Sequence, residues 1–238
     1  MLKRYRNLLC LFLLPLLALT LPRSDSAVAV QNVVTPQYIA LTFDDGPAPE
    51  TTERLLDGLK ERGAHATFFL VGGQIDGMED IVRRMHDEGH QIGNHTYSHT
   101  RLDCGDSAAL GDVSKADTRL CEVLGDGEYW VRPPWGFVSD TVRQSVNVPL
   151  IYWSVDTEDW RSRNTDIIAH TIVETAKSGD IVLLHDIHSA SVDAALRAID
   201  TLSAQGYQFV TVEELFSCYG VTPQSGHFYA CPDAEVCW

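Results

Sequence analysis

Short apolar runs alternate with amphipathic segments along the chain from Tyr38 onward. The apolar runs have the length and composition of buried strands. Between them, apolar residues recur every three or four positions, as Leu55, Leu56 and Leu59 do before Gly63, and this spacing predicts helices. The predicted strands are Tyr38–Phe43, Ala66–Val71, His90–Gly93, Tyr129–Arg132, Leu150–Ser154, Ile181–Leu184 and Gln208–Val210. The predicted helices are Glu50–Arg62, Glu79–Glu88, Ser107–Leu124, Thr165–Lys177 and Ser191–Gln205.

The order of these elements indicates the fold class. Strand and helix alternate about seven times, with no sequence repeat, low-complexity tract or Gly/Ser linker between them. Such alternation is typical of a parallel sheet with helices packed outside it. We therefore expect a single α/β domain, built either as a closed barrel or as an open sheet.

Polar residues gather at the predicted strand ends. In parallel α/β folds the carboxyl ends of all strands share one face, and that face carries the active site. We expect side chains from distant parts of the chain to meet there. They are Asp44 and Asp45 after the first strand, His95 and His99 after the third, Arg132 at the fourth, Asp156 and Asp159 after the fifth, and His185 after the sixth.

The first 29 residues have the pattern of a secretory signal peptide. Basic residues precede an apolar run from Leu8 to Leu21, and the small residues Ala27-Val28-Ala29 follow. The alternative is an uncleaved membrane anchor. The apolar run, however, contains Pro15 and is shorter than the roughly 20 residues that span a bilayer. We predict cleavage after Ala29, a catalytic domain at 30–216 and a cysteine-containing tail at 217–238.

The net charge and the cysteine content restrict which partners and which cellular compartment are expected. The 238 residues carry a net charge of −15; the signal segment has a net charge of +3, so the remaining 209 residues would carry −18. This balance argues against nucleic acid or anionic lipid as partners. Export implies an oxidising compartment, in which we expect at least one disulfide among the tail cysteines Cys218, Cys231 and Cys237. Cys104 and Cys121 would lie at opposite ends of one helix, too far apart to pair.

A metal site is predicted at the strand ends. His95 and His99 are four residues apart, so in a helical turn both imidazoles would lie on the same side. Such pairs also occur by chance, but an aspartate from another strand end would complete a His-His-Asp site for zinc or a similar divalent ion, with one position open for water. An ion there would lower the pKa of water and polarise a carbonyl oxygen.

The remaining ionisable residues suit acid–base chemistry beside this site. Asp44 would be the base and His185 the acid, with Arg132 orienting Asp44 and Asp159 raising the pKa of His185. Each has a structural alternative when taken alone: a turn or helix cap for the aspartates, a buried core histidine for His185, and a surface salt bridge for Arg132. Their combination favours catalysis.

Five ordered motifs make the chain resemble the polysaccharide deacetylases of carbohydrate esterase family four, over roughly residues 37–215. The resemblance implies a distorted (β/α) barrel of about seven parallel strands and metal-dependent removal of acetyl groups from sugar polymers. The motifs are Thr42-Phe43-Asp44-Asp45-Gly46-Pro47, His95-Thr96-Tyr97-Ser98-His99, Arg132-Pro133-Pro134-Trp135, Asp156-Thr157-Glu158-Asp159-Trp160 and Leu183-Leu184-His185.

The resemblance also implies a role for each motif residue. Asp45, His95 and His99 would bind the metal. Asp44 would be the general base, contacted by Arg132, and His185 the general acid, tuned by Asp159. The backbone N–H of Trp135 would stabilise the oxyanion, and Leu183 and Trp160 would line a pocket for the acetyl methyl group.

From this resemblance and the signal-peptide pattern we expect a monomeric hydrolase, secreted, periplasmic or in the cell wall, that uses Zn²⁺ or another transition metal such as Co²⁺. Its partner would be an acetylated glycan, and its reaction the release of acetate from N-acetylglucosamine units of peptidoglycan or chitin. The alternatives are an acetyl-xylan esterase acting on O-acetyl groups and a glycan-binding module without turnover. No nucleic acid and no membrane span after signal cleavage are expected.

Overall fold

Strand β1 (Gln37–Asp44) lies in the middle of a parallel sheet. The structure is a computed structural model, and it describes residues 36–236. Strand β1 pairs in parallel with β2 (Thr67–Leu70) on one side and β6 (Ile181–His185) on the other, in the order β3-β2-β1-β6-β5. Its residues from Ile39 to Phe43 are fully buried, because both faces of the strand are covered. This explains its nearly continuous apolar sequence.

The sheet curves into an incomplete barrel. Strand β3 (Gln91–Asn94) is linked through bridges at Val131 to β4 (Leu150–Ile151), and β5 (Val155–Asp156) pairs with β6 at the other end. Strand β7 (Tyr207–Phe209) pairs with the first residues of β1. The predicted parallel α/β barrel is confirmed.

The prediction of a strand at Tyr129–Arg132 is wrong. Only Val131 bridges to both neighbours, Asn94 and Leu150, so no continuous ladder forms. Two prolines follow directly, Pro133 and Pro134, and proline has no N–H to donate to a ladder. The segment nevertheless lies in the barrel wall, because the N–H of Arg132 donates to the Asn94 carbonyl at 2.9 Å.

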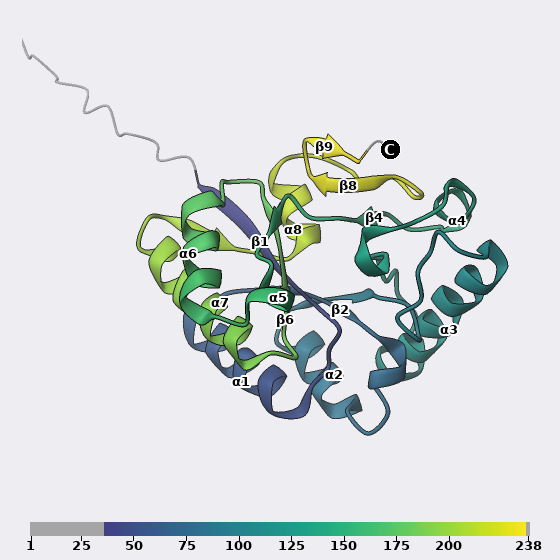
Figure 1. The fold of residues 1–238 in the computed structure, drawn as a ribbon, viewed down its shortest axis with the longest axis horizontal. Coiled ribbons are helices and arrows are strands. Elements are labelled where there is room, and N and C mark those ends of the chain that lie inside the picture. The colour runs from purple at the N-terminus through teal and green to yellow at the C-terminus, as the bar shows by residue number, and fades with distance from the viewer. Residues whose placement is uncertain (1–35, 237–238) are drawn as a thin grey trace, which may run out of the picture. The chain divides into compact units, whose positions relative to one another are not determined.

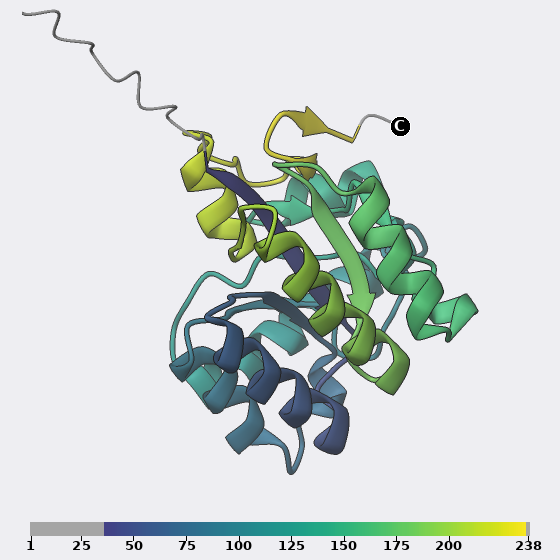
Figure 2. The ribbon, with the colours of Figure 1, turned by 90° about the vertical axis from the view of Figure 1, so that its left-hand side faces the viewer.

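All five predicted helices are confirmed, with small shifts in their ends, and they pack outside the strands (Figures 1 and 2). Helix α1 begins with Pro49, whose fixed φ suits a first helical position, and ends at Gly63, whose φ of 59° is left-handed. The five are α1 (Pro49–Arg62), α2 (Glu79–Asp87), α3 (Asp106–Leu124), α6 (Thr165–Thr175) and α7 (Ser189–Ser203). The shorter elements are η1 (Gly72–Gln74), η2 (Pro134–Gly136), α4 (Asp140–Ser145), α5 (Asp159–Ser162), α8 (Val212–Cys218), β8 (Phe228–Cys231) and β9 (Ala234–Glu235).

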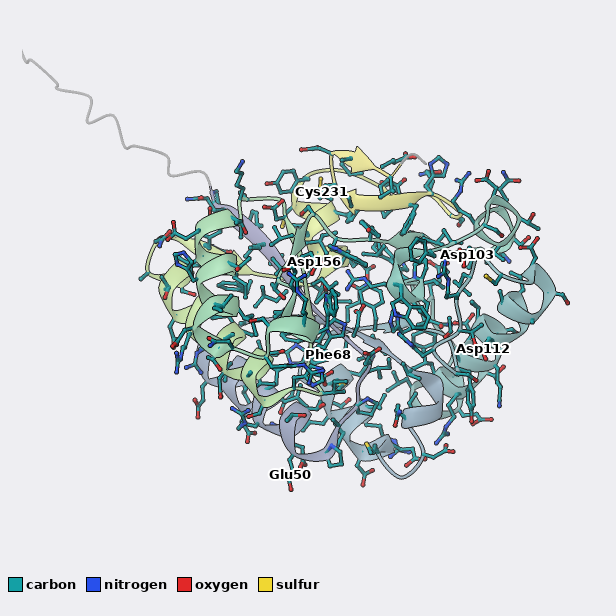
Figure 3. The ribbon with its side chains drawn as sticks, in the orientation of Figure 1. Glu50, Phe68, Asp103, Asp112, Asp156 and Cys231 are labelled. Atoms are coloured by element: carbon teal, nitrogen blue, oxygen red, sulfur yellow. The ribbon has the colours of Figure 1, made fainter. Side chains whose placement is uncertain are left out.

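The tail contributes a strand to the barrel. Strand β8 pairs in parallel with β4, with Leu150 opposite Phe228 and Ile151 opposite Tyr229. Phe228 and Tyr229 are buried, and β9 folds back on β8 as a hairpin that carries Cys231 (Figures 1 and 3). Apolar residues of the tail thus cover the end of the sheet that β4 would otherwise expose.

Two predictions depend on residues outside the described range. The signal peptide at 1–29 lies outside it, and so does Cys237. Among the described residues, Cys104, Cys121, Cys218 and Cys231 form no disulfide with one another, so the tail disulfide stays a prediction that would involve Cys237. Within residues 36–236, no helix has both the length and the apolar character needed to cross a membrane.

The tail strand should be needed for stability. Phe228→Ala removes a side chain that is 1% exposed, and we expect it to lower the free energy of unfolding by about 3–5 kcal/mol, because it leaves a cavity. Urea unfolding followed by circular dichroism measures this. Ile167→Ala is the control, since Ile167 on α6 is 56% exposed and its loss should change stability by less than about 0.5 kcal/mol. Equal effects would contradict a structural role for the tail.

Candidate active site

A cavity of about 410 Å³ opens at the carboxyl ends of the strands. Eight of the ten predicted site residues line it, and the other two, Arg132 and Asp159, lie behind Asp44 and His185. The structure therefore brings together all the residues that the motifs indicated. The lining residues are Asp44, Asp45, His95, His99, Trp135, Phe137, Trp153, Asp156, Trp160, Leu183 and His185.

Asp45, His95 and His99 form a group that suits a metal ion. Asp45 Oδ1 lies 3.2 Å from His99 Nε2 and 3.6 Å from His95 Nε2, and one ligand atom from each residue lies within 4.8 Å of the others. Among the described residues, Asp45 Oδ1 is buried without a hydrogen-bond partner. A buried carboxylate oxygen without a donor is costly. Two imidazoles and this oxygen are a donor set that zinc and related ions prefer.

His95 is prepared to act as a ligand by its surroundings. Its Nδ1–H donates to the carbonyl of Arg132 at 2.7 Å, which leaves the lone pair of Nε2 facing Asp45. Burial lowers the pKa of His95 to about 3, although the charge of Asp45 opposes this shift. The imidazole is therefore neutral at physiological pH, which is the state that binds metals.

The two histidines do not lie on a helical turn, so that part of the prediction is wrong. Strand β3 ends at Asn94, and His95 to His99 form a loop in which Thr96 and His99 have φ values of 65° and 54°. The side chain of Asn94 accepts from the Thr96 N–H, and the Thr96 hydroxyl accepts from the Thr100 N–H. These side-chain contacts replace the backbone hydrogen bonds of a helix, yet the loop still brings both imidazoles to Asp45.

Asp44 is held by a buried arginine. Arg132 is fully buried, and its Nη1 donates to Asp44 Oδ1 at 2.8 Å and to the Thr42 hydroxyl at 2.6 Å. Its Nη2 donates to the carbonyl of Tyr152 at 2.7 Å, and its guanidinium lies over the ring of Phe69. Burial raises the pKa of Asp44, and the charges of Arg132 and His185 limit the rise.

His185 is held by Asp159. Its Nδ1 donates to Asp159 Oδ1 at 2.8 Å, and its backbone N–H donates to Oδ2 at 2.8 Å. Ser191 also donates to Oδ2, at 2.6 Å. Burial alone would lower the pKa of His185, but the hydrogen bond and charge of Asp159, with Asp44 and Asp45, raise it to about 9. The imidazole is thus protonated at neutral pH, and its Nε2–H is left for the cavity.

Apolar side chains form the rest of the cavity wall. Trp135 and Trp160 are about half exposed, whereas Leu183, which also lines the cavity, is buried. Trp135 sits in the turn η2 with a left-handed φ of 55°, and its ring lies against that of His99 at 4.3 Å between centroids. Asp156, near the middle of Figure 3, also faces the cavity, and its Oδ1 accepts from the N–H of Glu158.

Backbone strain is concentrated around this cavity. The described non-glycine residues with positive φ are Asp45, Thr96, His99, Trp135, Glu158 and Arg163. Each such residue costs about 1–2 kcal/mol, and it persists only where the surroundings hold it in place. Asp45, His99 and Trp135 line the cavity themselves, and Thr96 and Glu158 are next to His95 and Asp159.

Several residues that contribute to the site were not among those predicted from the sequence. Ser191 supports Asp159 from α7, and Thr42 supports Arg132 from inside β1. Phe137 and Trp153 line the cavity beside the predicted aromatic residues. Thr42 belongs to the first motif and could have been identified from it, whereas Ser191 lies in no motif that would distinguish it from the other serines.

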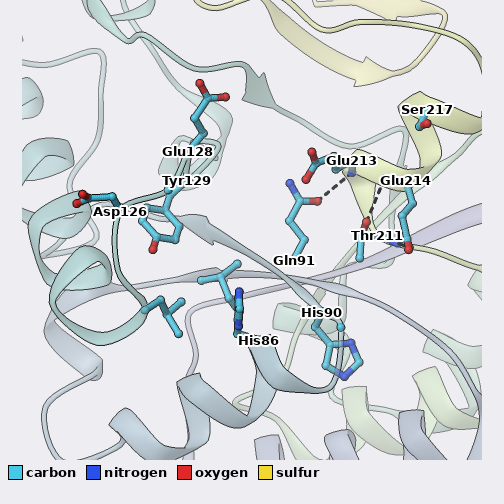
Figure 4. A pocket seen from close by; sticks show the side chains of 14 residues that line it. His86, His90, Gln91, Asp126, Glu128, Tyr129, Thr211, Glu213, Glu214 and Ser217 are labelled. Atoms are coloured by element: carbon cyan, nitrogen blue, oxygen red, sulfur yellow. Dashed lines mark hydrogen bonds between the residues drawn. The ribbon is translucent and has the colours of Figure 1, made fainter.

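A larger hollow of about 550 Å³ lies elsewhere and contains none of these residues. It is at the beginning of β3, where His90 and Gln91 line it together with acidic residues of α8 and of the segment after α3, among them Glu213, Glu214 and Asp126 (Figure 4). Active sites of parallel α/β folds lie at the opposite ends of the strands. The chemistry therefore points to the smaller cavity.

Known proteins resemble this chain over most of its length. A family model for polysaccharide deacetylase matches residues 31–148. The peptidoglycan-N-acetylglucosamine deacetylase PgdA of Listeria monocytogenes is 37% identical over 210 residues, covering 88% of this chain and 44% of that protein. The solved structure of the peptidoglycan deacetylase PdaC from Bacillus subtilis is 38% identical with a TM-score of 0.76, covering 78% of this chain and 92% of that one. The chain belongs to the polysaccharide deacetylase family.

The family resemblance includes proteins named for different substrates. A structure of a family 4 acetyl xylan esterase from Clostridium thermocellum, in complex with a cobalt ion, is 30% identical with a TM-score of 0.77, covering 82% of this chain and 98% of that one. This chain spans less than half the length of the Listeria relative.

The contact between Asp159 and His185 should set the protonation of the imidazole. Asp159→Asn removes the negative charge that opposes the effect of burial and one of the two carboxylate oxygens, so the pKa of His185 should fall well below its value of about 9. Histidine NMR titration of the metal-free protein measures this. Asp156→Asn is the matched control, because it removes another carboxylate of the cavity that does not contact His185. A large fall with the control and none with Asp159→Asn would refute the assignment.

Proposed function

We propose that this chain is a metal-dependent hydrolase that removes N-acetyl groups from N-acetylglucosamine units of a polysaccharide and releases acetate. The observation that carries the proposal is the arrangement of one cavity: a carboxylate base and a protonated imidazole beside a His-His-Asp group. This combination suits the hydrolysis of an amide, because the carboxylate can accept a proton from water and the imidazolium can donate one to the leaving nitrogen.

Asp45, His95 and His99 would hold the metal ion. Their imidazole and carboxylate donors favour Zn²⁺, and Co²⁺ or another transition metal would fit the same ligands. The chemistry that the ion supplies when bound is to lower the pKa of a water molecule and to polarise the acetyl carbonyl.

Asp44 is the proposed general base. It accepts a proton from the attacking water as the water oxygen bonds to the acetyl carbonyl carbon. The second carboxylate oxygen, Oδ2, lies 3.7 Å from His95 Nε2, so it faces the metal-ligand group while Arg132 holds Oδ1 at 2.8 Å. The ion pair thus orients the base and keeps more of it ionised, since Arg132 lowers the pKa that burial raises.

His185 is the proposed general acid. An amine is a poor leaving group without a proton, so the C–N bond breaks as the imidazolium gives its proton to the amide nitrogen. The raised pKa of about 9 means that His185 carries this proton at neutral pH. Asp159 holds Nδ1 and, together with Ser191, fixes the direction in which Nε2 points.

The other predicted roles also belong to this proposal. The N–H of Trp135 would stabilise the oxyanion; the two residues before Trp135 are prolines and offer no N–H. Leu183 and the ring of Trp160 would receive the acetyl methyl group, because both contribute apolar surface to the cavity.

The substrate that we propose is peptidoglycan or chitin. Relatives named as peptidoglycan deacetylases support it. The signal-peptide pattern supports a secreted, periplasmic or cell-wall location, where such polymers occur. An acetyl xylan esterase is the second candidate, because a relative with that name shares the fold. A binding module without turnover is less well supported, since every proposed catalytic position is filled.

Acetate release should depend on both the metal and the base. We expect a chelator to abolish release and added Zn²⁺ or Co²⁺ to restore it, and we expect Asp44→Asn to lower kcat by about 10²–10⁴-fold. Coupled acetate detection measures both. The control, Asp180→Asn, changes an aspartate outside the cavity and should have wild-type kcat. Sugar binding with no metal-dependent acetate release would favour the binding module.

The choice between N-acetyl and O-acetyl substrates can be tested directly. We expect acetate from peptidoglycan or chitin oligomers, because a protonated His185 serves the poorer, amine leaving group. Acetylated xylan is assayed in parallel at equal acetyl concentration, with kcat/KM as the measure. Activity confined to xylan would overturn the N-deacetylase proposal in favour of the esterase.

A further inference from the structure

Asp186 is a buried acid that none of the roles above uses. It follows His185 at the end of β6, it is fully buried, and it does not line the cavity. Burying a carboxyl group is costly unless it has partners. The hydroxyl of Thr52 donates to its Oδ2, and Oδ1 has no hydrogen-bond partner among the described residues.

Thr52 connects this carboxyl group to the start of α1. Its hydroxyl accepts from the backbone N–H of Ala48 at 2.9 Å, so its own proton is free to go to Asp186. Ala48 is the N-cap residue and has no side-chain acceptor. The contact from Thr52 therefore resembles the reciprocal contact of a capping box, in which a side chain near the helix start accepts from the N–H of the N-cap residue.

The carboxyl group of Asp186 also packs against Gly46. A Cβ atom on Gly46 would lie 2.6 Å from Oδ1 and 2.7 Å from Oδ2, closer than any side chain tolerates. The carbonyl of Gly46 accepts from the N–H of Val71 at 3.1 Å, which anchors the other side of this loop. Gly46 comes directly after Asp45, so Asp186 touches the backbone next to a proposed metal ligand.

This contact explains how Asp45 keeps a strained backbone. Its φ of 73° is in the left-handed region, which a non-glycine residue leaves unless its surroundings hold it. Gly46 and Ala48 follow it in sequence, and Asp186 and Thr52 hold both. Asp186 follows His185 directly in the sequence. Its contact with Gly46 therefore joins the loop of the proposed metal ligand Asp45 to the strand end that carries the proposed acid His185.

We propose that Asp186 and Thr52 are positioning residues that hold the Asp45–Ala48 loop, and thereby aim the Asp45 carboxylate at His95 and His99. The inference rests on the proposed metal role of these three residues. It assigns no contact with substrate or metal to Asp186 or Thr52. Loss of the pair would let Asp45 relax from its strained conformation and would weaken metal binding.

The test is the affinity of each folded variant for Zn²⁺, measured by competition with a chromophoric chelator. Thr52→Val keeps the shape of the side chain but removes the hydroxyl, and we expect it to weaken Zn²⁺ binding by about tenfold or more. Thr52→Ser restores the hydroxyl and should stay within about twofold of wild type. Thr51→Val is the matched control, because the Thr51 hydroxyl on the same helix has no hydrogen-bond partner among the described residues.

A second pair of variants addresses the other partner. Asp186→Asn keeps an oxygen that accepts from Thr52 and should bind Zn²⁺ nearly as wild type does. Asp186→Ala removes the acceptor and should match Thr52→Val. This pair decides the question if Thr52→Val does not fold.

Thermal unfolding of the metal-free variants separates positioning from a merely structural role. Lower melting temperatures for Thr52→Val and Asp186→Ala with unchanged Zn²⁺ affinity would overturn the inference. Wild-type protein that binds no Zn²⁺ would overturn it together with the metal assignment. Wild-type protein that binds Zn²⁺ but releases no acetate would refute the proposed hydrolase activity alone, and the affinities of the variants would still decide the roles of Asp186 and Thr52.

Discussion

The ion pair between Arg132 and Asp44 is the interaction on which the rest of the site depends. A guanidinium inside a barrel must find acceptors on every side, and Arg132 finds them on Thr42, Asp44 and the backbone of Tyr152. Losing one partner of such a pair leaves a buried charge uncompensated, at a cost of about 3–5 kcal/mol. The pair therefore joins β1 to the segment after Val131 and gives the base one orientation.

The same principle recurs on the acid side of the cavity. Asp159 is fully buried and accepts from the side chain and backbone of His185 and from Ser191. Both proposed catalytic groups are thus exposed to the cavity on one side and held by a buried group of opposite charge on the other. Such support keeps reacting groups in place without a rearrangement during the reaction. The residues with positive φ around the cavity indicate that holding these groups in place costs some local stability.

Pattern reasoning succeeded where the signal is local and repeated. Strands β1 and β6 were predictable because each is a short, nearly continuous apolar run, and the longer helices because their apolar residues recur with the helical period. It failed where tertiary contacts decide the backbone. The segment at Tyr129–Arg132 has apolar residues like a strand, but only Val131 pairs. Strand β8 could not be foreseen, since its partner β4 lies far away in the sequence and has only two residues.

The sequence by itself determined the order of strands and helices, the face on which the polar residues meet and the identity of the proposed site residues, because these follow from periodicity, parallel connection and motif spacing. Only the tertiary structure decided how those residues are held. The loop from His95 to His99 is held by side-chain hydrogen bonds in place of the backbone hydrogen bonds of a helix. Two other contacts join segments that are distant in the chain: Ser191 supports Asp159, and Asp186 contacts Thr52 and Gly46. Such contacts form only when packing excludes water, and no period in the sequence records them.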